Sequence, residues 1–398
     1  RICNQLSNKN KYVHVTHRYD SERDMLDVVI KVGTINPSTE ELKYHFHTIF
    51  EVARELLMEN DNRDQVTEEE RRDVLVKFAL PQNIEGLERD LKKYRIVYDN
   101  WFKESTLHNN GEAAKVVELL TERGYTYEQD GALWFKGEEF NTEDFVLRRS
   151  NGFFTYVVPD IAYHYNKLVT RNFDKAIDIL GADHHGYVPR LKGALTALGV
   201  DADRLDVILM QLVRLTRDGE VVRMSKRTGK AITLVDLLED IPVDAVRFLF
   251  NMREPGSQMD FDLDLAVEQS SQNPVYYCQY ANARIHSILR KVEADGVTVR
   301  DCTKDELKLL TAPEEIELIR HLASLTDEIV NSAKNYDPAK ITRYCIDLAT
   351  LFHKFYNACR VAVEDEALMQ ARLYLCTCVM NVITNILTTF SISTPESM

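Results

Sequence analysis

The segment Ala176–Val213 reads AIDILGADHHGYVPRLKGALTALGVDADRLDVILMQLV and decides the fold class. It opens with the apolar run AIDIL, which ends at Gly181, and it closes with a second apolar run, VILMQLV. Between the two runs, residues 190–198 are expected to form a helix. A strand, a helix and a second strand in this order are typical of a parallel sheet with a crossover helix. The segment therefore predicts an α/β domain.

The sequence pattern changes on either side of this segment. Residues 1 to about 130 are charged and mainly helical in pattern, with helices expected at 68–77, 85–94 and 111–123. Hairpin turns are expected at Asp130-Gly131 and Asn151-Gly152. From Leu234 to the end, apolar residues recur at helical spacing, which predicts a helix bundle. Two apolar stripes support this prediction, the first made of Ile316, Ile319, Leu322, Leu325 and Ile329, and the second of Tyr344, Leu348, Leu351, Phe355 and Cys359.

The composition narrows the class of protein. The chain has 398 residues, 44% of them hydrophobic and 28% charged, which is enough for two or three domains and excludes a disordered or fibrous protein. The net charge of −14 slightly favours a small-molecule enzyme, although a local basic patch can still bind phosphates. Seven scattered cysteines predict reduced thiols in a cytoplasmic protein. Because no apolar run approaches the ~20 residues that cross a bilayer, no membrane segment is expected.

Positive charge is concentrated in residues 217–230, which read RDGEVVRMSKRTGK. Ammonium and guanidinium groups can follow negative charge as it moves among phosphate oxygens, so this loop suits a polyphosphate ligand. The alternative is an ordinary solvated basic turn. The basic residues of the loop are Arg217, Arg223, Lys226, Arg227 and Lys230.

The turn after the first apolar strand, GADHHG at 181–186, is a second candidate site. Ligands of open parallel sheets bind beyond the carboxyl ends of the strands, where this turn is expected to lie. Gly181 permits close approach of the backbone, and the Asp183 carboxylate can accept hydrogen bonds from ribose hydroxyls. The alternative is a structural Gly-Asp turn. Adjacent side chains rarely converge on one ion, so His184 and His185 predict no metal site.

The third candidate site lies at Tyr156 and Asp160, in the segment TYVVPDIAYH. Tyr156 is expected to close a strand, and Asp160 is expected in the first turn of the following helix, so the two side chains could flank one pocket. A carboxylate beside a phenol suits a guanidinium or ammonium ligand. The alternative is an aspartate that stabilises the helix N-terminus.

Three segments taken in order, residues 155–167, 180–195 and 223–238, closely resemble the second half of the catalytic domain of arginyl-tRNA synthetases. The DAVR sequence at 244–247 is similar to the family's D-A-L-R element, and NPVYY at 273–277 is similar to the start of its anticodon-binding bundle. The resemblance implies a Rossmann-type parallel sheet followed by an all-α bundle. It also implies three regions, namely a connective insertion at 1–130, the C-terminal half of the Rossmann domain at 131–240, and the anticodon-binding domain at 241–398.

The resemblance implies the reaction of this family as well. L-Arginine and ATP, accompanied by Mg²⁺, form arginyl-adenylate and pyrophosphate, and the arginyl group then passes to tRNA(Arg). The loop Arg223, Met224, Ser225 and Lys226 matches the K-M-S-K-S motif, with Arg223 in place of the first lysine. Lys226 falls on the second lysine, which is expected to stabilise the departing pyrophosphate, and Met224 and Lys226 are expected to contact ATP.

The remaining site residues follow from the same resemblance. Tyr156 and Asp160 match the positions that recognise arginine, in agreement with the guanidinium ligand suggested by their chemistry. Gly181, Asp183 and His184 match the turn near the adenosine ribose. The resemblance implies no structural metal, and we expect a monomer that works in the cytoplasm without a membrane.

Class I synthetases also carry an H-I-G-H motif. The sequence HVTH at 14–17 has the same spacing but places Thr16 where the motif has glycine, so we interpret it as a chance match. The resemblance therefore implies that this chain is the C-terminal part of such an enzyme and incomplete for catalysis by itself. Two other classes stay open. One is a non-catalytic tRNA-binding or regulatory paralogue, and the other is an unrelated nucleotide-binding α/β enzyme, which would leave the DAVR and NPVYY elements without an explanation.

Overall fold

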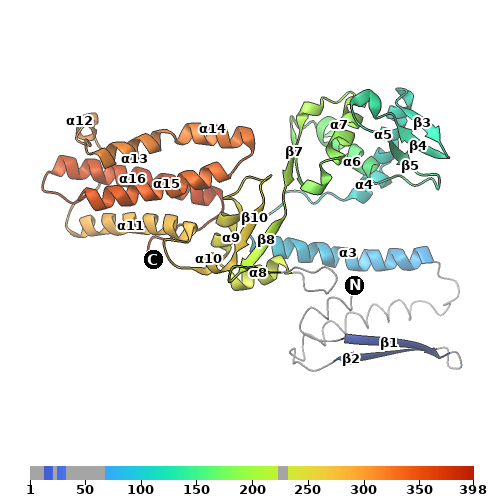
Figure 1. Ribbon diagram of the computed structural model, residues 1–398, viewed down its shortest axis with the longest axis horizontal. Helices are drawn as coiled ribbons and strands as arrows, with labels where there is room; N and C mark the ends of the chain where they lie inside the picture. The colour runs from blue at the N-terminus through green and yellow to red at the C-terminus, as the bar shows by residue number, and fades with distance from the viewer. Residues whose placement is uncertain (1–12, 21–24, 33–67, 223–231) are drawn as a thin grey trace. The chain divides into compact units, whose positions relative to one another are not determined.

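The computed structural model describes residues 13–20, 25–32, 68–222 and 232–398 (Figure 1). The chain divides into two compact units. The first unit holds residues 1–97 and 223–240, and the second holds residues 98–222 and 241–398.

The described part of the first unit consists of a β-ladder and two helices. Strand β1 (Val13–Asp20) pairs antiparallel with β2 (Met25–Val32), so a ladder forms within the region that the sequence predicted to be mainly helical. The valines at alternate positions at the start of β1 favour this extended chain. The H-x-x-H sequence at 14–17 lies inside β1 and begins no helix. Helix α3 (Glu68–Lys93) runs through Pro81 as one element where two were expected, and it contacts α8 (Leu234–Asp240).

The second unit begins with two helices and an antiparallel sheet. The hairpin predicted at Asp130-Gly131 is confirmed, because both residues have positive φ (53° and 73°), as a type I′ turn requires. The chain also turns at Asn151-Gly152, but it returns through an isolated bridge between Arg148 and Phe154 rather than through a long strand. The elements are α4 (Glu104–Asn109), α5 (Glu112–Glu122), β3 (Thr126–Gln129), β4 (Ala132–Phe135), the short helix η1 (Glu138–Phe140) and β5 (Phe145–Arg148), with sheet order β3-β4-β5.

The predicted parallel sheet is confirmed. Strands β6 (Ala176–Gly181) and β7 (Leu205–Met210) pair in parallel along their whole length, and α7 (Tyr187–Ala197) connects them. The strand expected at 207–213 is interrupted, because the Gln211 N–H donates to the Pro255 carbonyl and the chain then enters another sheet. That sheet has the order β10-β8-β9 and consists of β8 (Val213–Arg217), β9 (Glu220–Val221) and β10 (Met259–Asp262), with β10 parallel to β8.

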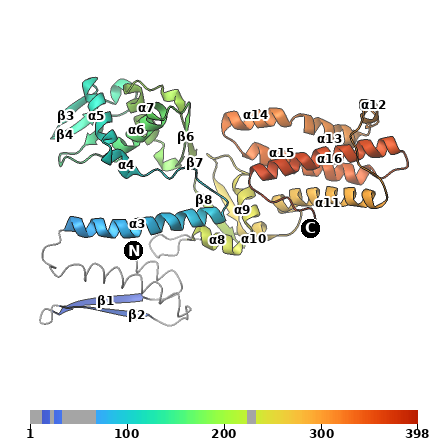
Figure 2. The ribbon, with the colours of Figure 1, turned by 180° about the vertical axis from the view of Figure 1, so that it is seen from behind.

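A buried apolar core fixes the helices beside β6 and β7. Helix α6 (Val157–Tyr165) packs against α5 and α7 (Figure 2). It continues into a π-helical turn, η2 (Asn166–Thr170). Each fully buried aliphatic side chain stabilises this packing by roughly 1.5–3 kcal/mol. The core therefore holds the N-terminal end of α6 in place. Its contributors include Val116 and Leu120 on α5, Val158 and Ile161 on α6, and Leu191 and Leu195 on α7.

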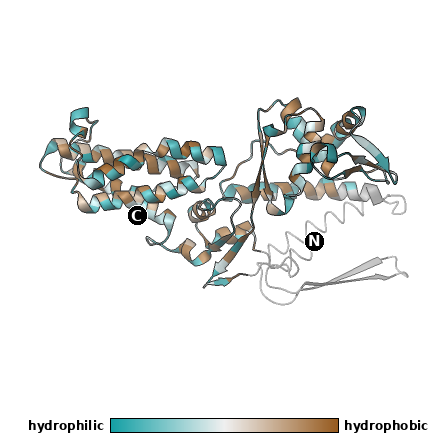
Figure 3. Cartoon of the chain, turned by 45° about the horizontal axis from the view of Figure 1, so that its top comes forward, coloured by the Kyte–Doolittle hydropathy of each residue, from teal (hydrophilic) through white to brown (hydrophobic). Residues whose placement is uncertain are grey.

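The predicted helix bundle is confirmed from residue 274 onward. Figures 1 and 2 show α11, α13, α15 and α16 side by side, and apolar and polar residues alternate along the bundle helices (Figure 3). A linking segment holds α9 (Val243–Phe250) and α10 (Leu263–Val267). The bundle helices are α11 (Pro274–Ala294), α12 (Lys304–Leu307), α13 (Pro313–Ala323), α14 (Leu325–Asn335), α15 (Ala339–Ala358) and α16 (Glu366–Thr389).

The second of the two predicted apolar stripes is largely buried, but the first is not continuous. In the second stripe, Tyr344, Leu348 and Phe355 are buried on α15. The first stripe is interrupted, because α13 ends at Ala323 and α14 begins at Leu325, so Ile329 is 51% exposed. A new helix has its own direction, and a stripe drawn through both helices does not keep one buried face.

Helix α16 is, among the described helices, the one long and apolar enough to cross a membrane by length and composition. In the second unit it packs against α11 and α15. Its Arg372 donates to Glu315 on α13 at 2.7 Å, and both side chains are largely buried. These contacts are those of a core helix in a bundle, which meets the same length and composition test.

Candidate functional site

The start of α6 presents Tyr156 and Asp160. The helix begins at Val157, two residues earlier than the sequence suggested, so Tyr156 precedes its first turn and Asp160 lies within it. The two residues are four apart and share one side of the helix, while the apolar residues on the other side join the core. Tyr156 is 68% exposed and Asp160 is partly buried. The structure thus brings the two predicted arginine-recognition residues together at one helix end.

Tyr187 on α7 binds Asp160 directly. Its phenolic O–H donates to Asp160 Oδ2 at 2.5 Å. Burial, together with the carboxylate of Asp160, raises the pKa of Tyr187 well above its usual value, so the phenol keeps its proton. The Tyr156 and Tyr187 ring centroids lie 5.8 Å apart. The Asp160 carboxylate therefore accepts a hydrogen bond from Tyr187 on α7 and none from the main-chain N–H groups at the start of α6. This pattern disfavours the alternative that Asp160 only caps the helix.

The Gly181–Gly186 turn follows the carboxyl end of β6, as the sequence predicted. A Cβ at Gly181 would lie 2.6 Å from Asp183 Oδ1, so the glycine lets this carboxylate fold over the main chain. Asp183 and the His184 ring are both exposed, and His184 Nε2 lies 4.0 Å from Asp183 Oδ1. The turn offers ligands an accessible carboxylate and an imidazole.

A cavity of about 380 Å³ joins the two predicted sites. Tyr156 reaches it from the residue just before α6, and Asp183 and His184 reach it from the turn after β6. This volume is within the usual range of small-molecule sites. Tyr156 and a group of residues at least 27 positions further along the chain thus line one concave surface. The lining residues are Tyr156, Asp183, His184, Gly186, Tyr187 and Arg190.

Sequence reasoning missed Tyr187. The available signal was an aromatic residue directly after the GADHHG turn, at the first position of a crossover helix. The predicted ATP-contacting residues of the basic loop, Arg223, Met224, Ser225 and Lys226, lie outside the described residues.

A cluster of aromatic and basic side chains lies on the bundle, and sequence reasoning named none of its members as a site. The Arg284 guanidinium on α11 lies 4.6 Å from the Tyr280 ring centroid and 4.9 Å from that of Tyr356 on α15. It also donates to the Tyr280 hydroxyl at 2.6 Å. Exposed aromatic faces beside an arginine are what unstacked RNA bases bind. A tyrosine four residues before an arginine on one helix was the sequence signal.

His353 supports this cluster from within the bundle. Burial and the charge of Arg284 lower the pKa of His353 to about 4, so the ring is neutral at pH 7. Its Nδ1 faces Arg284 Nη1 at 3.2 Å and can only accept there, which places the ring proton on Nε2. Within the described residues, this buried Nε2 has no hydrogen-bond partner.

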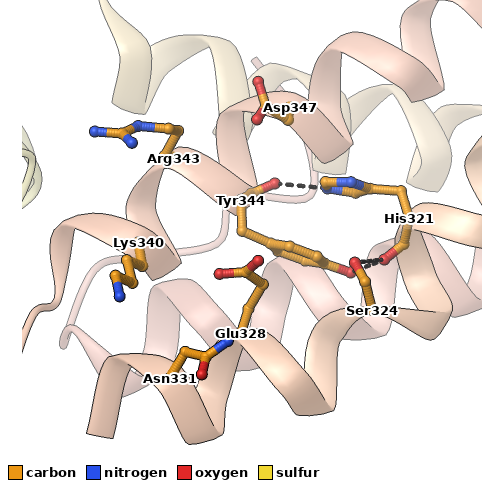
Figure 4. A pocket seen from close by; sticks show the side chains of 8 residues that line it. All are labelled: His321, Ser324, Glu328, Asn331, Lys340, Arg343, Tyr344 and Asp347. Carbon is orange, nitrogen blue, oxygen red and sulfur yellow. Dashed lines mark hydrogen bonds between the residues drawn. The ribbon is translucent and has the colours of Figure 1, made fainter. Parts of the chain in front are cut away.

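A second cavity, of about 370 Å³, lies between α13, α14 and α15 (Figure 4). The His321 and Tyr344 rings stack there with centroids 4.1 Å apart, and each side chain bonds the other residue's carbonyl, at 3.0 and 2.7 Å. His321 and Tyr344 thus provide each other's hydrogen-bond partners. None of the site residues predicted from the sequence lines this cavity. It is lined by His321, Ser324, Glu328, Asn331, Lys340, Arg343, Tyr344 and Asp347.

Comparisons with known proteins give a consistent result. Residues 23–285 match the family described as tRNA synthetases class I (R), catalytic domain, and residues 278–398 match the DALR anticodon binding domain. The chain is 52% identical to the arginine–tRNA ligase of Caldanaerobacter subterraneus subsp. tengcongensis, over 92% of this chain and 65% of that protein. It is 50% identical to the arginine–tRNA ligase of Acetivibrio thermocellus, over 89% of this chain and 63% of that protein. The chain thus spans somewhat less than two thirds of the length of these relatives.

Solved structures agree with these matches. The putative arginyl-tRNA synthetase of Campylobacter jejuni aligns with a TM-score of 0.74 at 28% identity, covering 92% of this chain and 78% of that chain. The Thermus thermophilus arginyl-tRNA synthetase aligns with a TM-score of 0.67 at 21% identity, covering 91% and 68%, and shows the fold alone. The Rossmann-type catalytic fold and the helical anticodon-binding domain predicted from the sequence are confirmed.

Proposed function

Since the chain belongs to the family of class I tRNA synthetases (R), we propose that the protein carrying it is an arginine–tRNA ligase. In this proposal, the protein activates L-arginine with ATP and transfers the arginyl group to tRNA(Arg). One observation carries the proposal most directly, namely that Tyr187, which lines the cavity beside Tyr156 and the turn after β6, donates its phenolic O–H to the Asp160 carboxylate. The relatives that bear this name support it.

Arginine recognition is assigned to Asp160 and Tyr156. A guanidinium group is planar, stays charged and donates several N–H groups, and a carboxylate can accept two of them in parallel. The exposed Tyr156 ring offers a face that attracts a cation. A neutral side chain of similar shape would leave the carboxylate unpaired, which rejects such substrates strongly.

ATP binding is assigned to the turn after β6 and to the basic loop. Gly181, Asp183 and His184 are proposed to lie near the adenosine ribose, because the Asp183 carboxylate can accept hydrogen bonds from ribose hydroxyls. Arg223, Met224, Ser225 and Lys226 form the K-M-S-K-S-like loop, in which Lys226 neutralises the leaving pyrophosphate. Mg²⁺ is proposed to accompany ATP as part of the substrate.

The chemistry proposed for the site is two displacements. In the first, a carboxylate oxygen of arginine attacks the α-phosphorus of ATP, the bond from that phosphorus to the β-phosphate oxygen breaks, and pyrophosphate leaves. In the second, a terminal ribose hydroxyl of tRNA attacks the arginyl carbonyl carbon and loses its proton, the bond from that carbon to the phosphate oxygen breaks, and AMP leaves. Positioning and charge stabilisation supply most of the rate in such phosphoryl chemistry. A fixed guanidinium site contributes by holding the arginine carboxylate in line with the phosphate.

The remaining proposals concern the whole protein. Residues 1–130 are proposed as a connective insertion, 131–240 as the C-terminal half of the catalytic domain and 241–398 as the anticodon-binding part. The cluster of Tyr280, Arg284 and Tyr356 is proposed as a surface for tRNA bases. The protein is further proposed to work as a monomer in the cytoplasm.

Pyrophosphate exchange tests the proposed function. The complete protein carrying this chain is expected to incorporate labelled pyrophosphate into ATP when arginine and tRNA(Arg) are present, and to do so far less with citrulline, whose side chain is a neutral isostere. Aminoacylation of the tRNA should follow the same preference. Binding of tRNA without any exchange would support the non-catalytic paralogue instead, and exchange supported equally by citrulline would overturn the arginine assignment.

Replacing Arg284 by Ala is expected to weaken tRNA binding about tenfold, because the change removes a charge and the stacked guanidinium plane together. Filter binding at fixed salt measures the effect. Arg290 on the same helix, which bonds the Glu396 carbonyl, provides the matched control, and Arg290→Ala should change affinity by twofold or less. Equal losses in the two variants would remove the special role of the aromatic cluster.

A further inference from the structure

Asp160 is held at two points by side chains of different elements. Tyr187 on α7 donates its O–H to Asp160 Oδ2 at 2.5 Å. His164, one turn further along α6, places Nδ1 2.7 Å from the Asp160 carbonyl oxygen. Within the described residues, the other carboxylate oxygen, Oδ1, has no hydrogen-bond partner. Tyr187 thus orients the side chain and His164 holds the main chain, with one carboxylate oxygen left for a ligand.

The His164 ring is also held by Asp178 on β6. Its Nε2 lies 2.5 Å from Asp178 Oδ2 on β6, and the residue is 5% exposed. The other oxygen of Asp178 accepts from Lys167 Nζ at 2.9 Å. The Lys167 ammonium lies 4.7 Å from the Tyr163 ring centroid. A continuous polar chain therefore runs from Lys167 through Asp178 and His164 to Asp160, and on to Tyr187.

The charge state of Asp178 is well defined. Burial alone would raise the pKa of Asp178, but the hydrogen bonds and charges of His164 and Lys167 outweigh it and lower the pKa to about 2. Asp178 is therefore ionised at any working pH of the protein. An anchored anion of this kind keeps the imidazole of His164 in one orientation, as carboxylate–histidine pairs do elsewhere.

Stability by itself gives little reason for this arrangement. Asp178 lies between Ile177 and Ile179 on β6, and its side chain faces α6 with the polar chain. Replacing a buried charged network by apolar groups of similar volume is often neutral or stabilising. A charged network in this position suits a role in fixing geometry, and the residue that the network reaches is Asp160.

We propose that Tyr187 and His164 are positioning residues that set the orientation of Asp160 for the guanidinium of arginine, with Asp178 and Lys167 anchoring His164. This inference rests on the proposed function. Tyr187 occupies Oδ2 and so fixes the plane of the carboxylate, while His164 fixes the main chain from which the carboxylate projects. Neither residue is required to touch arginine or ATP.

Tyr187→Phe gives the first test in the complete protein. Removing one hydrogen bond to a charged group is expected to raise the KM for arginine about tenfold and to leave the KM for ATP within twofold. The matched control is Tyr127→Phe, because Tyr127 O–H also donates to an aspartate, Asp144, at 2.9 Å, away from the cavity. That control should leave both KM values unchanged.

Two substitutions of His164 separate positioning from packing. In His164→Asn, the side-chain amide can reach the position of Nδ1 and keep the hydrogen bond to the Asp160 carbonyl. In His164→Gln, the amide reaches the position of Nε2 and keeps the hydrogen bond to Asp178 instead. The proposal expects the arginine KM to rise about tenfold in the Gln variant and twofold or less in the Asn variant. Equal arginine KM values in the two variants would overturn the role of His164, even if both were less stable to heat.

The outcomes also separate this inference from the proposed function. A wild-type protein without arginine-dependent exchange refutes the function itself. An active wild type in which Asp160→Asn fails to bind arginine, but Tyr187→Phe behaves like Tyr127→Phe, refutes the positioning role alone.

Discussion

Replacing Asp160 by Asn is expected to weaken arginine binding about 100-fold, because the guanidinium then meets a neutral amide whose N–H groups face its own donors. Asparagine has the same size as aspartate and can still accept the hydrogen bond from Tyr187, so the fold should be preserved. Calorimetry gives the affinity, and the KM for arginine in pyrophosphate exchange gives the same comparison during turnover.

Asp183, which lines the neighbouring cavity, provides the control. Asp183→Asn is expected to raise the KM for ATP and to leave arginine affinity within twofold, since Asp183 is assigned to the ribose side. Asp160→Asn should therefore raise mainly the KM for arginine, and Asp183→Asn mainly the KM for ATP. An unaltered arginine affinity in Asp160→Asn would remove the basis for assigning Asp160 to amino-acid recognition.

Replacing Lys226 by Ala is expected to slow formation of arginyl-adenylate by about 10²–10³-fold, the usual loss when one group that stabilises transition-state charge is removed. Arginine affinity should stay within twofold, because the lysine is assigned to the leaving pyrophosphate rather than to the amino acid. Single-turnover measurement of adenylate formation separates this step from product release.

Lys226→Arg gives the matched comparison within the same loop. It keeps the positive charge but changes the shape and reach of the donor, so it should recover part of the lost rate. A single-turnover rate in Lys226→Ala equal to that of the wild type would refute the assigned role. A loss in arginine affinity larger than the loss in rate would also contradict this role, because Lys226 would then act on arginine rather than on the pyrophosphate of ATP.

Local patterns in the sequence were enough for most of the fold. The apolar runs on either side of the helix near 190–198 predicted the parallel pair β6 and β7, and Asp130-Gly131 predicted a hairpin turn that the positive φ angles confirm. The β1–β2 ladder was missed in a region expected to be mainly helical, and two further errors occurred where a pattern crossed an element boundary. The apolar stripe ending at Ile329 crosses from α13 into α14, and the expected strand at 207–213 divides between β7 and β8.

By itself, the sequence determined which chemistry is present, because residue type and close spacing are local properties: a carboxylate four residues from a phenol, a Gly-Asp turn after a strand, and a lysine in a basic loop. Only the tertiary structure decided which groups meet. Tyr187 is 27 positions from Asp160, and Asp178 is 14 positions from His164. Those contacts arise when α6, β6 and α7 pack on one core, and a contact between packed elements leaves no periodic signal in the chain.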